Sequence, residues 1–242
     1  MMINEFRTIV RGLMWWASIL IVCSFVFLLP LKSHQSLSVL VFQELKSRFL
    51  PEGVELVVTN PLSAFLAEMT ISVSLSFIVS MPFLIYSMAR YLSPAMFVRE
   101  RRLVRRILIP SMILFLLGCA FAYFFIIPST FKLLYPFANA LGARPFFLLD
   151  EFVTTIMTFM IATGVLFLLP IFMILLSWIG LVSHYFWKEN WRYALVLFLI
   201  VSAIITPDGT GITMLMLTLP FVILYATGSV VSKRIENYKL KI

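Results

Sequence analysis

The sequence predicts an all-α integral membrane protein with six transmembrane helices. Of its 242 residues, 62% are hydrophobic and only 12% are charged, whereas a soluble domain carries about 25% charged residues. Several apolar runs reach the roughly 20 residues that a helix needs to cross a bilayer, and the alternation typical of membrane-spanning strands is missing. We therefore treat residues 1–242 as one helical membrane domain, with spans at about 13–31, 69–91, 107–127, 153–179, 193–205 and 212–231.

The first span follows a short polar lead that contains Glu5 and Arg7. A cleaved signal peptide is the alternative interpretation of this region. However, the apolar run at 13–31 is longer than the roughly 7–15 apolar residues of a signal peptide, and no small-residue cleavage site follows it. We therefore expect a helix that is retained in the protein.

The segment between the first two spans predicts a structured loop outside the membrane, because residues 37–50 have the spacing of an amphipathic helix. The second span contains Pro82, which removes a backbone hydrogen bond and should bend the helix. Serine and threonine gather in the first half of this span. Such hydroxyl groups bond to helix carbonyls, so a packing role is favoured over a polar substrate path.

Prolines and glycines predict how the later spans end or bend. The third span is expected to end at Pro128, and Gly164 and Pro170 predict a tilt or a kink in the fourth. The fifth span, at 193–205, has 13 residues, which rise about 20 Å against roughly 30 Å of hydrocarbon. We therefore expect the fifth and sixth spans to form a short reclining hairpin, with an outer turn around Pro207 and Asp208.

The positive charges predict the orientation of the chain. Short cytoplasmic loops of membrane proteins are rich in lysine and arginine. With both termini in the cytoplasm, the inner segments hold 14 of the 19 basic residues. Five arginines of this set lie in the turn between the second and third spans, at 93–106. The distribution therefore favours six spans with both ends inside.

Two carboxylates on the predicted inner side lack a basic neighbour on their own helix. Residues three and four positions apart are neighbours on a helix surface, and at these offsets neither Glu5 nor Glu100 has a lysine or arginine. Glu189 has Arg192 at the third position, and Glu236 has a lysine on each side. A lone acid near a membrane surface is usually solvated or locally paired, but Glu5 and Glu100 are candidates to receive a cation from another molecule, ideally the forked guanidinium of an arginine.

The sequence carries no pattern of catalytic or metal-binding residues. The motifs H-E-x-x-H, G-x-S-x-G and the P-loop do not occur, so we expect neither an enzyme nor a cofactor. Cys23 and Cys119 both fall inside apolar runs, where a thiol behaves as a small hydrophobe. We predict no disulfide and no metal site. The basic residues sit beside the spans, which membrane orientation explains without nucleic-acid binding.

Short motifs follow one another in an order that resembles a known family. Around the first cytoplasmic loop they are Asn4-Glu-Phe-Arg7, Leu84-Ile-Tyr86, Arg90-Tyr-Leu-Ser-Pro94 and Glu100-Arg101. Further along they are Phe121-Ala-Tyr-Phe-Phe-Ile-Ile-Pro128, Gly164-Val-Leu-Phe-Leu-Leu-Pro170, Thr206-Pro-Asp208, and Pro220 with Leu224-Tyr225. Their order and the six spans together resemble the TatC family, the signal-peptide receptor subunit of the twin-arginine protein translocase.

The resemblance implies a cupped bundle whose fifth and sixth helices are short. It also implies a receptor that binds the twin-arginine signal peptides of folded precursor proteins and nucleates the translocon. The family's two signal-peptide carboxylates match Glu5 and Glu100, which helical spacing also singles out. The matched motifs add four residues to the predicted signal-peptide site: Arg7, Tyr91, Pro94 and Arg101. A partner-subunit or structural role is predicted for Pro128, Pro170, Pro207, Asp208 and Pro220.

The partners implied by the resemblance are the signal peptides, small single-span subunits of the TatA/TatB type, further copies of the chain and the lipid bilayer. The expected location is the prokaryotic plasma membrane, with an organellar inner membrane as the alternative. Leu168 and Ala226 stand where the family often has an acid. The alternative functions are a membrane-complex assembly factor and a small secondary transporter. A transporter should show inverted repeats and ionisable residues near span centres, and the sequence shows neither.

Overall fold

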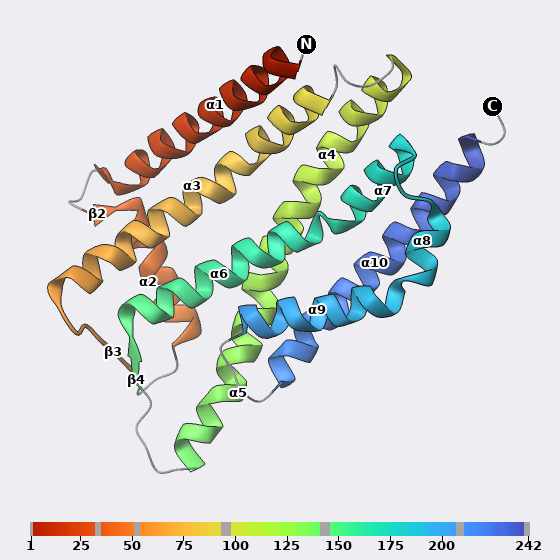
Figure 1. Ribbon diagram of the computed structural model, residues 1–242. Coiled ribbons are helices and arrows are strands. Elements are labelled where there is room, and N and C mark those ends of the chain that lie inside the picture. The colour runs from red at the N-terminus through yellow and green to blue at the C-terminus, as the bar shows by residue number, and fades with distance from the viewer. Residues whose placement is uncertain are drawn as a thin grey trace.

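The protein is a bundle of long helices with small strand pairs at one end (Figure 1). The computed structural model describes residues 2–31, 35–50, 54–92, 98–140, 146–206 and 211–239. Within these residues, five helical stretches are long and apolar enough to cross a membrane, and a shorter apolar helix spans Trp191–Ile205. The all-α membrane fold with six membrane helices is therefore confirmed. The five long stretches are Val10–Leu28, Pro61–Ser87, Ile107–Leu133, Leu149–Trp178 and Ile212–Arg234.

Helix α1 (Met2–Leu28) packs antiparallel along α3 (Pro61–Leu92) (Figure 1). The Trp16 and Phe77 rings meet edge to face, with centroids 5.8 Å apart. The helix α3 begins earlier than the span expected at 69–91, because Asn60 caps it: the Asn60 side-chain oxygen accepts the Ser63 N–H at 2.8 Å. Because α1 and α3 are antiparallel, the start of α1 lies beside the end of α3.

The buried serines of α3 bond to the helix itself. The Ser72 hydroxyl donates to the Glu68 carbonyl oxygen at 3.0 Å, and the Ser76 hydroxyl donates to the Ser72 carbonyl oxygen at 2.6 Å. Both side chains are fully buried. Hydroxyl groups that are satisfied by their own helix leave an apolar surface for packing. These bonds agree with the packing role expected from the sequence.

The segment between α1 and α3 is structured, as expected. It contains the helix α2 (Leu37–Phe49), whose start is capped by the Ser36 hydroxyl. Two strand pairs fasten this region: β1 (Pro30–Leu31) pairs antiparallel with β2 (Gln35–Ser36), and β3 (Glu55–Val57) pairs parallel with β4 (Phe146–Leu148). The second pair ties the chain before α3 to the chain before α6.

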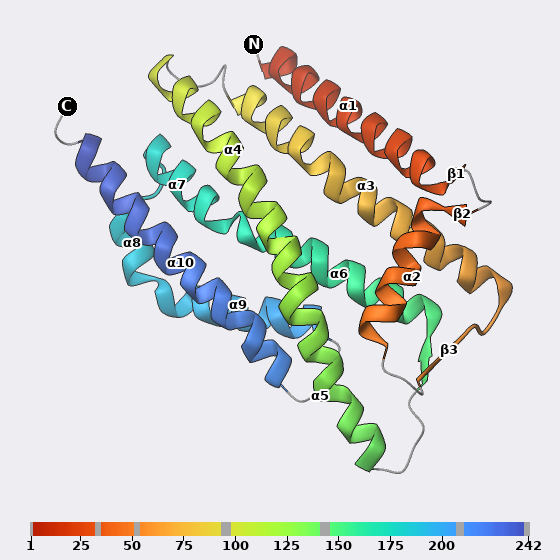
Figure 2. The ribbon, with the colours of Figure 1, turned by 180° about the vertical axis from the view of Figure 1, so that it is seen from behind.

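The third span does not end at Pro128, so this prediction was wrong. Helix α4 (Val98–Phe121) continues through a π-helical turn, η1 (Ala122–Ile126), into α5 (Ile127–Ala140), and the three form one rod (Figure 2). A proline ring clashes with the carbonyl four residues earlier. In the wider π turn, the Ile127 N–H bonds to the Ala122 carbonyl oxygen, five residues back. We attribute the passage of the helix through Pro128 to this widened turn.

The fourth span is broken, in agreement with the kink expected from its proline. Helix α6 (Leu149–Phe167) ends at Leu168, and α7 (Leu169–Ile179) begins with Pro170 in its first turn. Proline is tolerated there because the first N–H groups of a helix have no partner within the helix. Gly180 then ends α7 in the left-handed conformation, with φ +86°.

The last two spans are unequal. Helix α8 (His184–Glu189) leads into α9 (Trp191–Ile205), which has 15 residues, as a short fifth helix requires. Helix α10 (Ile212–Lys239) has 28 residues, so the expectation of a short sixth helix was wrong. The helix is long because it continues past its apolar part into the basic end of the chain. The turn at Pro207 and Asp208 lies outside the described residues, so the depth of the hairpin stays a prediction.

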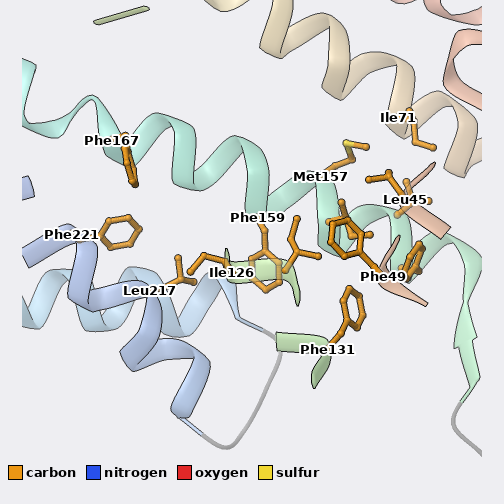
Figure 3. Close-up of a cluster of buried hydrophobic side chains, with 14 of the residues drawn as sticks. Leu45, Phe49, Ile71, Ile126, Phe131, Met157, Phe159, Phe167, Leu217 and Phe221 are labelled. Atoms are coloured by element: carbon orange, nitrogen blue, oxygen red, sulfur yellow. The ribbon is translucent and has the colours of Figure 1, made fainter. Parts of the chain in front are cut away.

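The hydrophobic core is arranged around α6 (Figure 3). Phe159 of α6 is fully buried in the middle of this cluster, with Ile126 of the π turn and Leu217 of α10 on one side and residues of α2 on the other. At the crossing with α4, the backbones approach closely: a Cβ atom built on Gly118 would lie 2.8 Å from the Gly164 Cα atom. Only glycine permits this approach. Further core residues come from α2, α3, α5 and α10: Leu45, Ile71, Phe131, Leu217 and Phe221.

Candidate functional site

The described residues that are predicted to bind the signal peptide lie at one end of the bundle. The start of α1, the end of α3 and the start of α4 share this end in both views (Figures 1 and 2). Glu5 and Arg7 belong to the first two turns of α1, and Tyr91 belongs to the last turn of α3. Glu100 and Arg101 belong to the first turn of α4. Pro94 lies outside the described residues, in the connection between α3 and α4.

The packing of the helices brings these backbone positions together. The start of α1 lies beside the end of α3 because the two helices pack antiparallel. Helix α4 begins six residues after the last residue of α3, and a chain of six residues reaches at most about 20 Å. The fold therefore places the helix ends that carry Glu5, Tyr91 and Glu100 in one neighbourhood.

Helical position gives Glu5 and Glu100 a second feature, which spacing alone missed. Each acid lies near the N-terminus of its helix, where the first backbone N–H groups have no partner within the helix and the end of the helix dipole is positive. A carboxylate there is stabilised by about 0.3–1 kcal/mol. Stabilisation of the helix start is therefore the alternative role of the two acids. Any test of a binding role must distinguish it from this stabilisation.

Glu236 and Glu189, the two acids that have basic neighbours in the sequence, lie near the start of α8 and the start of α9, respectively. The Glu236 carboxylate accepts the backbone N–H of His184 at 2.8 Å, so α10 holds the first turn of α8. Glu236 is thus engaged by another helix, and its expected pairing with the lysines of its own helix stays a prediction. Arg192 lies over the Trp191 ring, 5.8 Å from its centroid, and Glu189 lines an open cavity beside both residues.

The prolines with a predicted partner-subunit or structural role fall in three described places. Pro128 follows the π turn, and Pro220 lies inside α10. Pro170 contacts α10: a Cβ atom built on Gly228 would lie 3.1 Å from the Pro170 Cα atom. The structure thus gives Pro170 a packing role between α7 and α10. Pro207 and Asp208 lie outside the described residues.

The positions of the two missing acids differ in their surroundings. Leu168, at the break between α6 and α7, packs against an apolar cluster of Met81, Phe115 and Cys119. Burying an acid among these apolar side chains would cost free energy, whereas leucine needs no polar partner there. Ala226 lies on α10 and lines a groove beside Trp187 and further aromatic side chains. The two departures from the family pattern thus extend apolar surfaces.

A hydrogen-bonded carboxylate at the opposite end of the bundle escaped the sequence analysis. Glu68 of α3 accepts hydrogen bonds from the Ser36 and Ser38 hydroxyl groups, the latter at 3.0 Å. These serines lie at the start of α2, so their hydrogen bonds to Glu68 fasten α2 to α3. The only signal in the sequence was a capping serine before residues 37–50. Among the described residues, no three histidine, cysteine or acidic side chains gather where they could hold a metal ion.

Fold and sequence define the class of protein first. Six apolar helices in the described part of the chain, five of them long enough to span a bilayer, make this chain a multi-pass integral membrane protein. Residues 2–220 match the sequence model of the family described as "Sec-independent protein translocase protein (TatC)". The chain therefore belongs to the TatC family and is a subunit of a Sec-independent protein translocase. Membership sets aside the alternatives of a secondary transporter and an assembly factor.

Individual relatives agree with this assignment. The chain is 36% identical over 197 residues to a TatC protein of Cenarchaeum symbiosum, covering 81% of this chain and 75% of the relative. It is 30% identical over 179 residues to the TatC protein of Escherichia coli, covering 74% and 69%. The crystal structure of a twin-arginine translocase receptor, TatC, superposes with a TM-score of 0.82 at 25% identity, over 96% of this chain and 99% of that one. The chain is thus a component of a protein-transport machine in a prokaryotic membrane.

Proposed function

We propose that this chain is the signal-peptide receptor of a twin-arginine translocase, and that Glu5 and Glu100 bind the arginine pair of the peptide. The main support is that the helix ends carrying these two acids lie at the same end of the bundle, on either side of the end of α3 (Figures 1 and 2). The similar crystal structure is that of a twin-arginine translocase receptor. The 14 basic residues of the predicted inner segments support a cytoplasmic location for this end, where folded precursor proteins would arrive.

The chemistry of the pair suits an arginine. A guanidinium group presents parallel N–H donors that fit a carboxylate in a bidentate arrangement, which a lysine ammonium cannot reproduce. The five arginines near Glu100 raise the local positive potential and oppose an incoming cation. A carboxylate within hydrogen-bonding distance must therefore overcome this repulsion. The same repulsion disfavours peptides that lack a well-placed arginine.

The size of the effect follows from the strength of one charged hydrogen bond. Such a bond contributes about 1.5–3 kcal/mol. Glu5→Gln and Glu100→Gln should therefore each weaken peptide binding by roughly 10- to 150-fold. We propose that Arg7, Tyr91, Pro94 and Arg101 belong to the same binding site, as the family's motifs imply.

The experiment is a binding titration of the purified protein with a synthetic peptide that carries two arginines before an apolar segment. Glu189→Gln is the matched control, because it removes one exposed acid on the same predicted side. We expect loss of affinity for the two site variants only, and little affinity for a twin-lysine peptide. Unchanged affinity in both site variants, together with a loss in Glu189→Gln, would show that the assignment is wrong.

As a receptor, the chain would also nucleate the translocon. The proposed partners are small single-span subunits of the TatA/TatB type and further copies of the chain. Support comes from α1, which presents large apolar side chains away from the bundle, such as Trp15, Ile21 and Phe25. Co-purification of a tagged chain with those subunits, with and without the signal peptide, tests this part separately from peptide binding.

A further inference from the structure

An apolar groove lies between α8, α9 and α10, away from the proposed peptide site. It encloses about 450 Å³, which is within the usual range of ligand pockets. Eight of its ten lining residues are aromatic or aliphatic, and the other two are Lys188 and Ser229. The aromatic members meet edge to face, as for Phe198 and Tyr225 with ring centroids 5.9 Å apart. The groove is therefore a rigid apolar slot with a cation at its rim.

The polar atoms of two aromatic lining residues, Tyr225 and Trp187, form hydrogen bonds within the protein and do not line the interior of the groove. The Tyr225 hydroxyl donates to the Trp187 carbonyl oxygen at 2.7 Å, and the Trp187 indole N–H donates to the Ser177 hydroxyl at 3.0 Å. Only the ring surfaces of Trp187 and Tyr225 remain for contacts inside the groove. Ala226 lines the same surface and adds no polar atom. A hydrocarbon chain suits this lining, whereas a sugar or a nucleotide would lose its hydrogen bonds to water there.

A second, open cavity adjoins the groove and carries charge. Its volume is about 510 Å³, it shares Lys188 and Trp191 with the groove, and Arg192 and Glu189 are its other charged lining residues. Lys188 and Arg192 are both solvent-exposed. Trp191 is 49% exposed and Tyr193, also at this cavity, is 76% exposed. Exposed aromatic rings beside cations mark the interface between a bilayer and water.

We propose that the groove and the adjoining cavity together bind one anionic phospholipid. An acyl chain occupies the apolar groove, and the phosphate lies at Lys188 and Arg192. Charge complementarity supports this occupant: two cations and one acid line the mouth of a slot that is otherwise apolar. The charge distribution predicts that this mouth lies on the inner side of the bilayer, which carries anionic lipid. The site is independent of the peptide-binding proposal, because it involves neither Glu5 nor Glu100.

The test compares lipid retention by native mass spectrometry, after extraction of the protein from bilayers of phosphatidylglycerol and phosphatidylcholine. The double variant Lys188→Gln/Arg192→Gln should bind phosphatidylglycerol roughly 30-fold more weakly, with phosphatidylcholine unchanged. Lys233→Gln/Arg234→Gln is the matched control, since these exposed residues of α10 line neither cavity. Glu189→Gln should strengthen the retention of phosphatidylglycerol, because it removes the one acid at the mouth.

Two further variants separate the acyl groove from the headgroup site. Ala226→Leu should fill the groove and reduce retention of both lipids, while Lys188→Arg should keep the preference for phosphatidylglycerol. Thermal unfolding in detergent verifies that each variant is folded. Equal losses in the site variant and in the α10 control would show diffuse charge and overturn the proposal. A photo-crosslinker at position 226 that labels a protein helix instead of lipid in whole membranes would also overturn it.

Discussion

Helices α1 and α6 are both membrane spans, but they are held in different ways. Only 6% of the first span is buried inside the protein, compared with 28% of the span that contains α6. Helix α1 packs mainly along α3, whereas α6 contacts α3, α4, α9 and α10. Stability therefore depends on the surroundings of α6, while α1 is a peripheral helix. The proposed peptide site joins these two regions, because Glu5 lies on α1 and Glu100 on α4, which packs against α6.

The largest expected effect on the free energy of unfolding comes from removing a large side chain from the core at α6. Phe159→Ala should lower the free energy of unfolding by about 2–3 kcal/mol, from roughly 24 cal/mol per Å³ of a cavity on the order of 100 Å³. The transfer term of a soluble core does not add fully, because the unfolded side chain remains in detergent or lipid. Titration with a denaturing detergent measures the change. Phe25→Ala on α1, at a residue that is 65% exposed, is the control and should change little.

The crossing of α4 and α6 should be almost as sensitive to an added methyl group. Gly118→Ala places a Cβ atom 2.8 Å from the Gly164 backbone, so the helices must separate. We expect a loss of about 1–2 kcal/mol, within the usual range for overpacking. Val22→Ile adds a methyl group on the exposed side of α1 and should be neutral. If both variants unfold alike, close packing at this crossing does not distinguish the two regions.

A smaller effect is expected where α1 meets α3. Trp16→Ala removes the edge-to-face contact with Phe77, and such pairs contribute about 0.5–1.5 kcal/mol. Because α1 carries Glu5, affinity for the twin-arginine peptide should fall as well, although the core stays intact. Trp15→Ala is the control, since Trp15 is 73% exposed. A fall in affinity for Trp15→Ala but not Trp16→Ala would separate peptide binding from the packing of α1.

Much of the fold was predictable because long apolar runs in the sequence indicate membrane helices. The helix within residues 37–50, the short fifth helix and the break near Pro170 all followed from local patterns. The passage of the third span through Pro128 was not predictable. A proline usually ends a helix, and the π turn that tolerates it depends on backbone geometry rather than on residue type.

The candidate site was only partly accessible from the sequence. Helical spacing singled out Glu5 and Glu100, but their location at the same end of the bundle depends on the antiparallel packing of α1 on α3, which is a tertiary feature. The engagement of Glu236 by α8 was missed for the same reason, because its partner lies 52 residues away in the chain. The bond between Glu68 and the start of α2 also joins residues from separate helices.

The most direct test of the peptide site is a double-mutant cycle between the protein and the peptide. Affinities are measured for the unaltered protein and for Glu100→Gln, each with a twin-arginine peptide and with a peptide in which one arginine is replaced by glutamine. If Glu100 binds that arginine, the two changes overlap, and the coupling should be about 0.5–3 kcal/mol. If Glu100 only stabilises the start of α4, the two losses should add, with a coupling near zero for both arginines of the peptide.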